Sequence, residues 1–245
     1  MSDGEGPGLP PGIELAWGLR QGPTRGPKRG LTLERIVAAA IKVALTDGIG
    51  ALSMSRLAGE LGVATMSLYR YVSAKDELLM VMVDTALGTP PDVPEGGGNW
   101  RAGLTSWAVA VRAAYRRHPW ALRVPISAPP LTPNNVAFLD MALRSLADTP
   151  LSEQQKLSTV LLLSGFVRNE ATLTADIAAA SAGGSPTAGY GAMVARLTDA
   201  ARFPALHRAI ASGALDDDDD LDVEFDFGLA RILDGVEALI RAGGQ

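Results

Sequence analysis

The chain has 245 residues, of which 47% are hydrophobic and 20% charged, a composition typical of a folded globular protein rather than a disordered one. It contains no cysteine, which excludes disulfides and thiol chemistry. No apolar run reaches the about 18 residues of a membrane-spanning helix. The first residues also lack the charged and then apolar pattern of a secretion signal. We therefore expect a cytoplasmic protein with no membrane partner.

The net charge of −5 is distributed unevenly along the chain. Residues 1–19 carry three acids and no base, whereas residues 20–75 carry nine Lys or Arg against three acids. Residues 76–245 carry thirteen bases against twenty-one acids. A polyanion responds to the local field rather than to the average charge. The segment 20–75 is therefore the part of the chain that suits nucleic acid.

The first thirty residues are rich in Gly and Pro, so we expect residues 1–30 to form a flexible, partly basic arm. Its last part carries Arg25, Lys28 and Arg29. Such an arm either enters a DNA minor groove, where cations meet the deepest negative potential, or is a solvated tail. The apolar residues between 13 and 19 are unusual in a linker, and one interpretation is that they dock on the body of the protein.

Residues 31–87 follow as a compact helical block. An apolar stripe at helical spacing predicts a helix over 33–45 that ends at Asp47-Gly48. A last helix of the block is predicted to begin after Ser73, a candidate N-cap, with acidic residues in its first turn. Between these two helices the spacing predicts two shorter ones.

The two short helices have the spacing of a helix-turn-helix. Ser53 can cap the first of them, and Leu57 and Ala58 lie on its buried face. Gly62 follows at the position where the backbone usually turns with a positive φ, and Leu68 plugs the small core from the second helix. The second helix of such a motif lies in the DNA major groove. The alternative is a helical hairpin that only packs.

This block resembles the N-terminal domain of the tetracycline-repressor (TetR) family of bacterial transcription regulators. The resemblance rests on Ile36-Val37-Ala38-Ala39-Ala40, Leu57-Ala58, Leu61-Gly62-Val63, Leu68-Tyr69-Arg70-Tyr71-Val72 and Lys75-Asp76-Glu77-Leu78. The outward residues of the second helix are Thr65, Met66, Ser67 and Arg70. The resemblance implies that Thr65, Met66 and Ser67 meet base edges, that Tyr69, Tyr71 and Lys75 meet phosphates, and that Ser55 and Arg56 also face DNA. Ala64 stands where the family often has a Ser, so Thr65 is the candidate cap.

A Gly- and Pro-rich stretch at 88–99 separates this block from a larger helical part at 99–245. Helices are predicted over 100–118, 134–147, 152–180, 192–201, near Leu206 and over 225–241. Ser152 and Gln155 form a capping-box pair, and the run Val160–Leu163 is apolar on every side, so it needs burial on more than one face. The run Asp216–Asp220 reads as a solvated loop, with a cation site as the alternative.

The larger part resembles the tetracycline-repressor-like C-terminal type, mainly through the sequence from Phe225 to Leu239. The resemblance implies a homodimer through helices near 152–180 and 225–241, a palindromic operator and a small-molecule effector in the core. Candidate effector contacts are the larger aromatic, sulfur and polar residues of this part, with ordinary core packing as the alternative for each except His118, whose alternative is to cap a helix end. They are Trp107, Tyr115, His118, Trp120, Phe138, Met141, Phe166, Asn169 and Met193.

No pattern in the chain indicates catalysis or a cofactor. The two histidines, His118 and His207, do not have the spacing of metal ligands on one helix. No segment reads as a strand, so we expect an all-α protein with an N-terminal three-helix helix-turn-helix domain and a larger helical effector-binding and dimerisation domain. The function that follows is a DNA-binding transcriptional regulator, a repressor released by a ligand. The alternatives are a small-molecule-binding helical protein with a non-functional helix-turn-helix and, less favoured, an enzyme.

Overall fold

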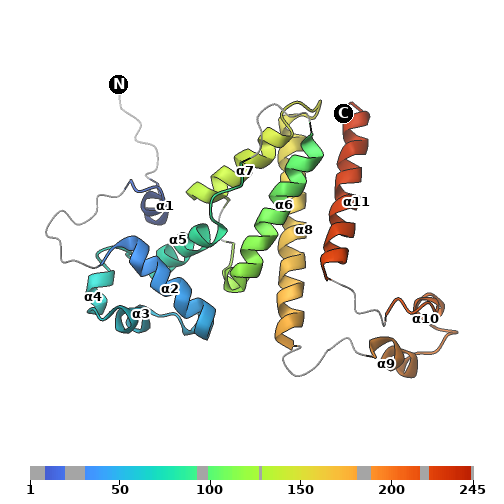
Figure 1. Cartoon of the computed structure of the whole chain (residues 1–245), viewed down its shortest axis with the longest axis horizontal. Coiled ribbons are helices and arrows are strands. Elements are labelled where there is room, and N and C mark those ends of the chain that lie inside the picture. The colour runs from blue at the N-terminus through green and yellow to red at the C-terminus, as the bar shows by residue number, and fades with distance from the viewer. Residues whose placement is uncertain are drawn as a thin grey trace.

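The computed structural model describes residues 9–19, 31–92, 99–126, 129–180, 189–215 and 221–243. Within these ranges every element of regular structure is a helix, which confirms the prediction of an all-α fold (Figure 1). Over the same ranges, no helix combines the length and apolar character needed to cross a bilayer.

The N-terminal domain is built around α2 and α5, with the helix-turn-helix beside them (Figure 1). Its helices are α2 (Leu33–Asp47), the 3₁₀ turn η1 (Ile49–Ala51), α3 (Met54–Leu61), α4 (Thr65–Leu68) and α5 (Lys75–Leu87). The core contains Ile36, Leu57, Leu68, Leu78 and Met82, all with no exposed surface. Helices α2, α3, α4 and α5 each contribute at least one of the five residues, and Leu78 and Met82 lie four residues apart on α5, so each helix buries one face against the others.

The expected caps of this domain are partly confirmed. The Ser53 side chain accepts a hydrogen bond from the backbone N–H of Arg56, as predicted. The expectation for Ser73 is wrong, because α5 has Ala74 at its N-cap, with no side-chain cap. Instead, the Glu77 carboxylate accepts a hydrogen bond from the backbone N–H of Ser73 at 2.8 Å. A side chain in the first turn of α5 thus reaches back to the residue before the N-cap.

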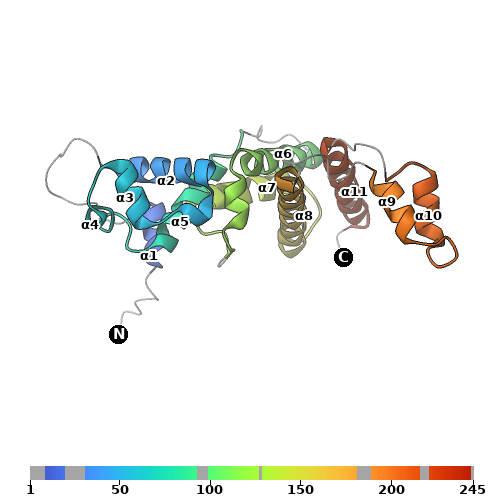
Figure 2. The same cartoon turned by 90° about the horizontal axis from the view of Figure 1, so that it is seen from below.

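The N-terminal segment contains a helix, α1 (Pro11–Ala16), where we expected an arm without regular structure. Pro11 occupies the first helical position, where its missing N–H costs no hydrogen bond. Ile13 and Leu15 are buried, and α1 packs on α5 (Figures 1 and 2). The interpretation that the apolar residues between 13 and 19 dock on the body is therefore confirmed for Ile13 and Leu15, whereas Leu19 is exposed. The burial of Ile13 and Leu15 explains why a helix forms despite the nearby Gly and Pro.

Two glycines of α3 predict opposite effects when each is replaced by Ala. Gly62 ends α3 with φ +66°, so an Ala there should lower the free energy of unfolding by about 1–2 kcal/mol. Gly59 lies inside the same helix, exposed and with open space where a Cβ would be, so Gly59→Ala should raise stability by about 0.5–1 kcal/mol. Urea unfolding of both variants checks this pair, and equal effects would contradict it.

The C-terminal domain is a bundle in which α6, α8 and α11 lie side by side and α7 crosses them (Figure 1). Its helices are α6 (Trp100–Arg117), the 3₁₀ turn η2 (Pro119–Arg123), α7 (Pro133–Ser145), α8 (Glu153–Ala180), α9 (Tyr190–Leu197), α10 (Pro204–Ala211) and α11 (Leu221–Arg241). Helix α11 begins four residues before the predicted start at 225. The run Asp216–Asp220 lies outside the described residues.

Both hydrogen bonds of the capping box predicted at the start of α8 are present. The Ser152 hydroxyl accepts from the Gln155 N–H at 3.3 Å, and the Gln155 side chain accepts from the Ser152 N–H at 2.9 Å. Further along α8, Val160 and Leu163 are buried, whereas Leu161 and Leu162 are 75% and 57% exposed. The apolar run therefore covers the core with one face and presents the other face outward.

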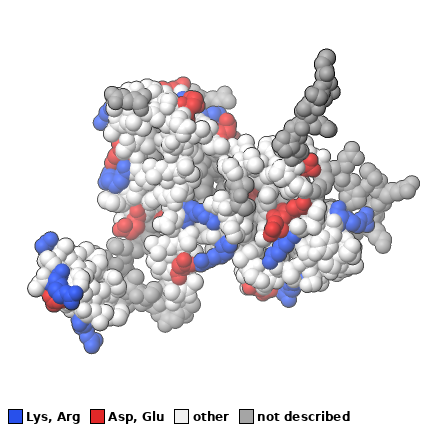
Figure 3. Space-filling view, turned by 180° about the vertical axis from the view of Figure 1, so that it is seen from behind, with Lys and Arg blue, Asp and Glu red and all other residues white. Residues whose placement is uncertain are grey.

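Helices α9 and α10 form a hairpin that extends from one end of the bundle (Figure 2). They contact each other, and Met193 and Leu197 of α9 are exposed. Arg196, Arg202 and Arg208 give this hairpin several basic side chains, visible at the lower left of Figure 3.

Candidate nucleic-acid interface

The turn between α3 and α4 holds the second helix of the motif in a defined position. The backbone N–H of Val63 donates to the Ala58 carbonyl at 3.0 Å, which closes the turn around Gly62. Leu68 has no exposed surface and fixes α4 to the domain core. Because α4 has only four residues, one buried leucine is enough to set which of its side chains face outward.

The outward face of this region consists of Met66, Tyr69 and Arg70. Met66 is 73% exposed and Tyr69 is 43% exposed, and Arg70 is exposed as well. Thr65 and Ser67 are only half-buried, so their hydroxyls remain within reach of a partner at the edge of the same surface. This surface combines a cation, a phenol and an apolar side chain, groups suited to phosphates, to base edges and to the thymine methyl.

The start of α4 differs from the expectation that Thr65 caps it. Thr65 is the first helical residue, and the N-cap is Ala64, which has no side-chain acceptor. The Ser67 N–H donates instead to the Ala64 carbonyl at 2.8 Å. The first turn is thus closed by the backbone alone, and neither the Thr65 nor the Ser67 hydroxyl caps the helix.

Tyr71 connects the motif to the start of α2. Its hydroxyl donates to the Leu31 carbonyl at 2.8 Å, across 40 residues of sequence. The hydroxyl that we predicted to meet a phosphate therefore already holds the chain entering α2. Arg35, in the first turn of α2, is an exposed cation that was not among the residues predicted to face DNA.

The predicted contacts on α3 and α5 are exposed but not equivalent. Arg56 makes an ion pair with Asp47 at 2.8 Å, and Ser55 shares a 3.1 Å hydroxyl contact with Ser53. Lys75 is exposed in the first turn of α5. A phosphate therefore competes with Asp47 for Arg56, while Lys75 is accessible in the structure as it stands. Arg25, Lys28 and Arg29 lie outside the described residues.

A second ion pair fixes α3 against α2. The Lys42 ammonium lies 2.7 Å from the Glu60 carboxylate. This contact lowers the pKa of Glu60 and raises the pKa of Lys42, in each case mainly through the hydrogen bond that they share. Both side chains are solvent-accessible, so the pair orients the two helices more than it stabilises them.

The candidate effector contacts divide into a buried group and scattered residues. Trp107, Phe138 and Met141 are buried together, and the Trp107 Nε1–H donates to the Phe138 carbonyl at 2.9 Å. Phe166 stacks on Phe225 with ring centroids 5.6 Å apart. Asn169 and Met193 are exposed, Met193 on the distant α9–α10 hairpin. The structure therefore brings only part of the predicted set to one place.

His118 and Trp120 lie where α6 passes into η2, beside Tyr115 at the end of α6. Their rings meet edge to face with centroids 6.0 Å apart. Within the described part of the chain, His118 Nδ1 and Trp120 Nε1 are buried without a hydrogen-bond partner. Burial, followed by the charge of Arg117, lowers the pKa of His118. Trp120 also packs into the core of the N-terminal domain, so η2 lies at the joint between the two domains.

Two grooves are open on the bundle surface. One, of about 660 Å³, follows α6 along Arg101, Thr105 and Val109, and the other, of about 430 Å³, lies between α8 and α11. None of the nine predicted effector residues lines either groove. The effector site therefore stays a prediction.

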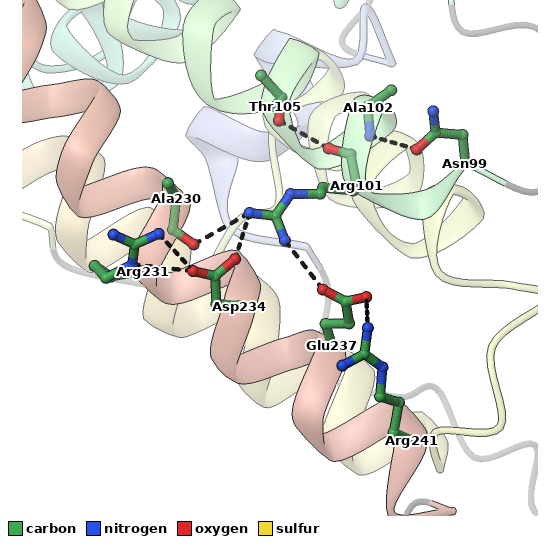
Figure 4. A network of polar contacts seen from close by, with 9 residues as sticks. All are labelled: Asn99, Arg101, Ala102, Thr105, Ala230, Arg231, Asp234, Glu237 and Arg241. Carbon is green, nitrogen blue, oxygen red and sulfur yellow. Dashed lines mark hydrogen bonds and ion pairs between the residues drawn. The ribbon is translucent and has the colours of Figure 1, made fainter.

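Polar contacts fasten the start of α6 to α11 near the first groove (Figure 4). Arg101 donates to the Asp234 carboxylate at 2.6 Å and to the Ala230 carbonyl at 3.3 Å. Hydrogen bonds from Arg101 and then from Arg231 lower the pKa of Asp234. These contacts hold α11 in register with the bundle.

The fold and this surface define a class of protein: an all-α regulator in which a helix-turn-helix is joined to a helical bundle. Two family models match the chain, "Bacterial regulatory proteins, tetR family" over residues 36–81 and "Tetracyclin repressor-like, C-terminal domain" over residues 91–240. The HTH-type transcriptional repressor DrrR1 of Streptomyces coeruleorubidus is 38% identical over 93% of this chain and 85% of its own length. The chain belongs to the TetR family of bacterial transcriptional regulators.

Solved structures agree with this assignment. Apo ActR of Streptomyces coelicolor is 30% identical, with a TM-score of 0.75 over 87% of this chain and 98% of that one. ActR in complex with actinorhodin is 28% identical, with a TM-score of 0.74 over 88% of this chain and 98% of that one. The segment 9–19, with α1, precedes the part that the N-terminal family model covers.

Proposed function

We propose that this regulator is a repressor that binds a palindromic operator as a homodimer and leaves it when a small molecule binds the bundle. The observation that carries the proposal is the exposed surface around Met66, Tyr69 and Arg70 on a rigidly packed helix-turn-helix. In this arrangement α4 enters the major groove, and Tyr69, Lys75 and Arg56 contact the backbone on either side. A DNA-binding regulator of this kind acts in the cytoplasm, beside the chromosome.

The outward apolar faces of α8 and α11 support the homodimer. Leu161 and Leu162 of α8 are exposed, as are Val223 and Phe227 of α11, although all four are large and apolar. Side chains of this kind on two adjacent long helices are typical of a surface that a partner covers. A second copy supplies the matching pair of helices, which makes a four-helix bundle. Two recognition helices then lie about 34–36 Å apart, one turn of DNA.

The proposal of a small-molecule effector rests on the ligands bound by structural relatives. ActR has been crystallised with actinorhodin and with (S)-DNPA, and we propose that the bundle of this chain binds a small molecule near Tyr115, His118 and Trp120. The two buried polar atoms without partners at His118 and Trp120 support this place, because a bound acceptor or donor would satisfy them. Binding there releases DNA only to the extent that the effector prefers one conformation over the other.

Selection of bound fragments from random and genomic DNA, followed by footprinting, tests the proposal. We expect a protected sequence with two-fold symmetry and half-sites one turn apart. Failure to select any sequence at moderate salt, from protein that is folded and dimeric, would favour the alternative of a small-molecule-binding protein with a non-functional helix-turn-helix.

Lys75 and Ser67 should differ in how they affect DNA binding. Lys75→Ala removes one phosphate contact, so it should weaken all sequences alike and reduce the slope of log K against log salt by about 1. Ser67→Ala should leave that slope unchanged and alter the preference at one or two base pairs. Titrations on the operator and on single-base variants, at several salt concentrations, separate the two effects. Identical behaviour of both variants would refute these roles.

A further inference from the structure

The N-terminus of α7 has no cap of its own. Its N-cap residue, Thr132, makes no side-chain bond to the helix backbone, and Pro133 at the first position has no N–H. The first free amides of the helix therefore belong to Asn134 and Asn135. A helix start that is buried against another element needs acceptors for these groups.

Those acceptors come from the other domain. The Asp84 carboxylate, on α5, accepts from the backbone N–H of Asn134 at 3.0 Å and from that of Asn135 at 3.2 Å. The Asn134 side chain donates in return to the Asp84 carbonyl at 2.9 Å. Asp84 is only 7% exposed. A buried carboxylate is here stabilised by the positive end of α7 and by direct hydrogen bonds.

Helix α5 belongs to the helix-turn-helix domain. Leu78 and Met82, six and two residues before Asp84 on α5, have no exposed surface and pack in the core that also holds Leu57 and Leu68. Any rotation of α5 therefore carries α3 and α4 with it. The bonds between Asp84 and α7 are consequently bonds between the DNA-binding domain and the effector domain.

A second contact reaches the same place from α1. The Trp17 indole N–H donates to the Leu131 carbonyl at 2.7 Å, directly before α7. Helix α1 is packed on α5, and a Cβ on Gly12 would lie 3.2 Å from the Met80 sulfur, so the two helices are in close contact. The start of α7 is thus held by α5 directly, through Asp84, and the residues before it are held indirectly, through Trp17 at the end of α1.

We infer that Asp84 is a positioning residue, and that its bonds to the start of α7, with Trp17 as a second contact, form a latch that sets the orientation of the helix-turn-helix relative to the bundle. The inference rests on the proposed function, since orientation matters only if two such domains must match two half-sites. Opening the latch leaves α5 free to rotate, and the spacing between the two recognition helices then becomes variable.

Hydrogen exchange tests the contact itself without any ligand. Asp84→Ala should accelerate exchange of the amides at the start of α7 roughly tenfold, the usual consequence of a lost helix cap. Asp84→Asn keeps an acceptor oxygen and should restore most of the protection. Asp140→Ala is the matched control, because Asp140 lies on α7 itself and forms its ion pair with Arg144 at the surface. Unchanged protection in Asp84→Ala would overturn the inference.

DNA binding tests the positioning role. With the operator in hand, Asp84→Ala should weaken binding to the full two-half-site operator at least tenfold and leave binding to an isolated half-site unchanged. Trp17→Phe, which keeps the ring and removes the N–H, should act in the same direction with a smaller effect. Asp140→Ala should change neither.

The outcomes are distinguishable from failure of the proposed function. If the wild-type protein binds no sequence, the proposed function is wrong. If the wild type binds and a folded Asp84→Ala variant keeps the wild-type ratio of full-site to half-site affinity, the latch is wrong. Should Asp84→Ala fail to fold, the same ratio measured on Trp17→Phe decides, and a wild-type ratio there would overturn the inference.

Discussion

Replacing Arg112 by Met is expected to lower the free energy of unfolding by about 3–5 kcal/mol, the usual cost of removing one partner from a buried ion pair. The Arg112 side chain is 8% exposed and that of its partner Glu170 is 13% exposed. Two hydrogen bonds, at 3.0 and 2.7 Å, join them. Arg112 also bonds Asp222 at 2.6 Å and lies 4.2 Å from the centre of the Phe225 ring. Its loss leaves the Glu170 carboxylate buried without its main partner.

Urea unfolding measures this effect, and the chain offers matched controls. Arg144→Met breaks an exposed pair with Asp140 on one helix, and it should cost only about 0.3–0.5 kcal/mol. Combining Arg112→Met with Glu170→Leu should recover much of the stability, because replacing both partners with apolar groups removes the uncompensated charge. A loss below about 1 kcal/mol for Arg112→Met would contradict the buried-pair interpretation.

The same network gives the protein an acid-sensitive component. The hydrogen bond from Arg112, with a further one from Arg116, lowers the pKa of Asp222 below its usual 3.8. A carboxylate whose pKa is lowered in the folded state stabilises the protein above the unfolded value, and this stabilisation is lost as the pH falls through the folded value. The difference in Tm between wild type and Arg112→Met should therefore shrink below about pH 4.

Leu161→Glu is expected to separate the proposed homodimer, with an increase of at least about 1,000-fold in its dissociation constant. Leu161 is 75% exposed on α8 and lies on the face that we assign to the partner. Burying a leucine contributes about 1.5–3 kcal/mol, two-fold symmetry places the change in both copies, and a glutamate adds the cost of burying a charge. Together these terms exceed the about 4 kcal/mol that corresponds to this factor.

Sedimentation velocity over a range of concentrations measures the change. Leu45→Glu is the control, because Leu45 is 50% exposed on α2, in the N-terminal domain rather than on α8 or α11, and it should leave the dimer intact. Circular dichroism should show both variants folded, since neither side chain belongs to the core. A dimer of wild-type strength in Leu161→Glu would place the interface elsewhere.

The helix-turn-helix could be derived from the sequence because its determinants are local. Ser53, Gly62 and Leu68 all lie between residues 53 and 68, and each has a backbone preference or a helical spacing that identifies it. The same holds for the capping pair of Ser152 and Gln155. The outward side of the motif followed from which of these residues must be buried.

Other parts depended on contacts between distant residues, for which no local pattern exists. The bond from Tyr71 to Leu31 spans 40 residues, and it joins the helix-turn-helix to the chain entering α2. The candidate effector residues were chosen by size and polarity, which do not distinguish a pocket wall from core. The structure places Trp107, Phe138 and Met141 in the core and Asn169 and Met193 at the surface.

By itself the sequence determined that this chain is helical, that residues 53–68 form a helix-turn-helix, and that α8 has apolar residues on more than one face. Only the tertiary structure decided which of those apolar residues are covered, that α1 docks on α5, and that Asp84 caps α7. The physical reason is that helix formation and capping depend on neighbours along the chain, whereas burial and long-range hydrogen bonds depend on which helices meet.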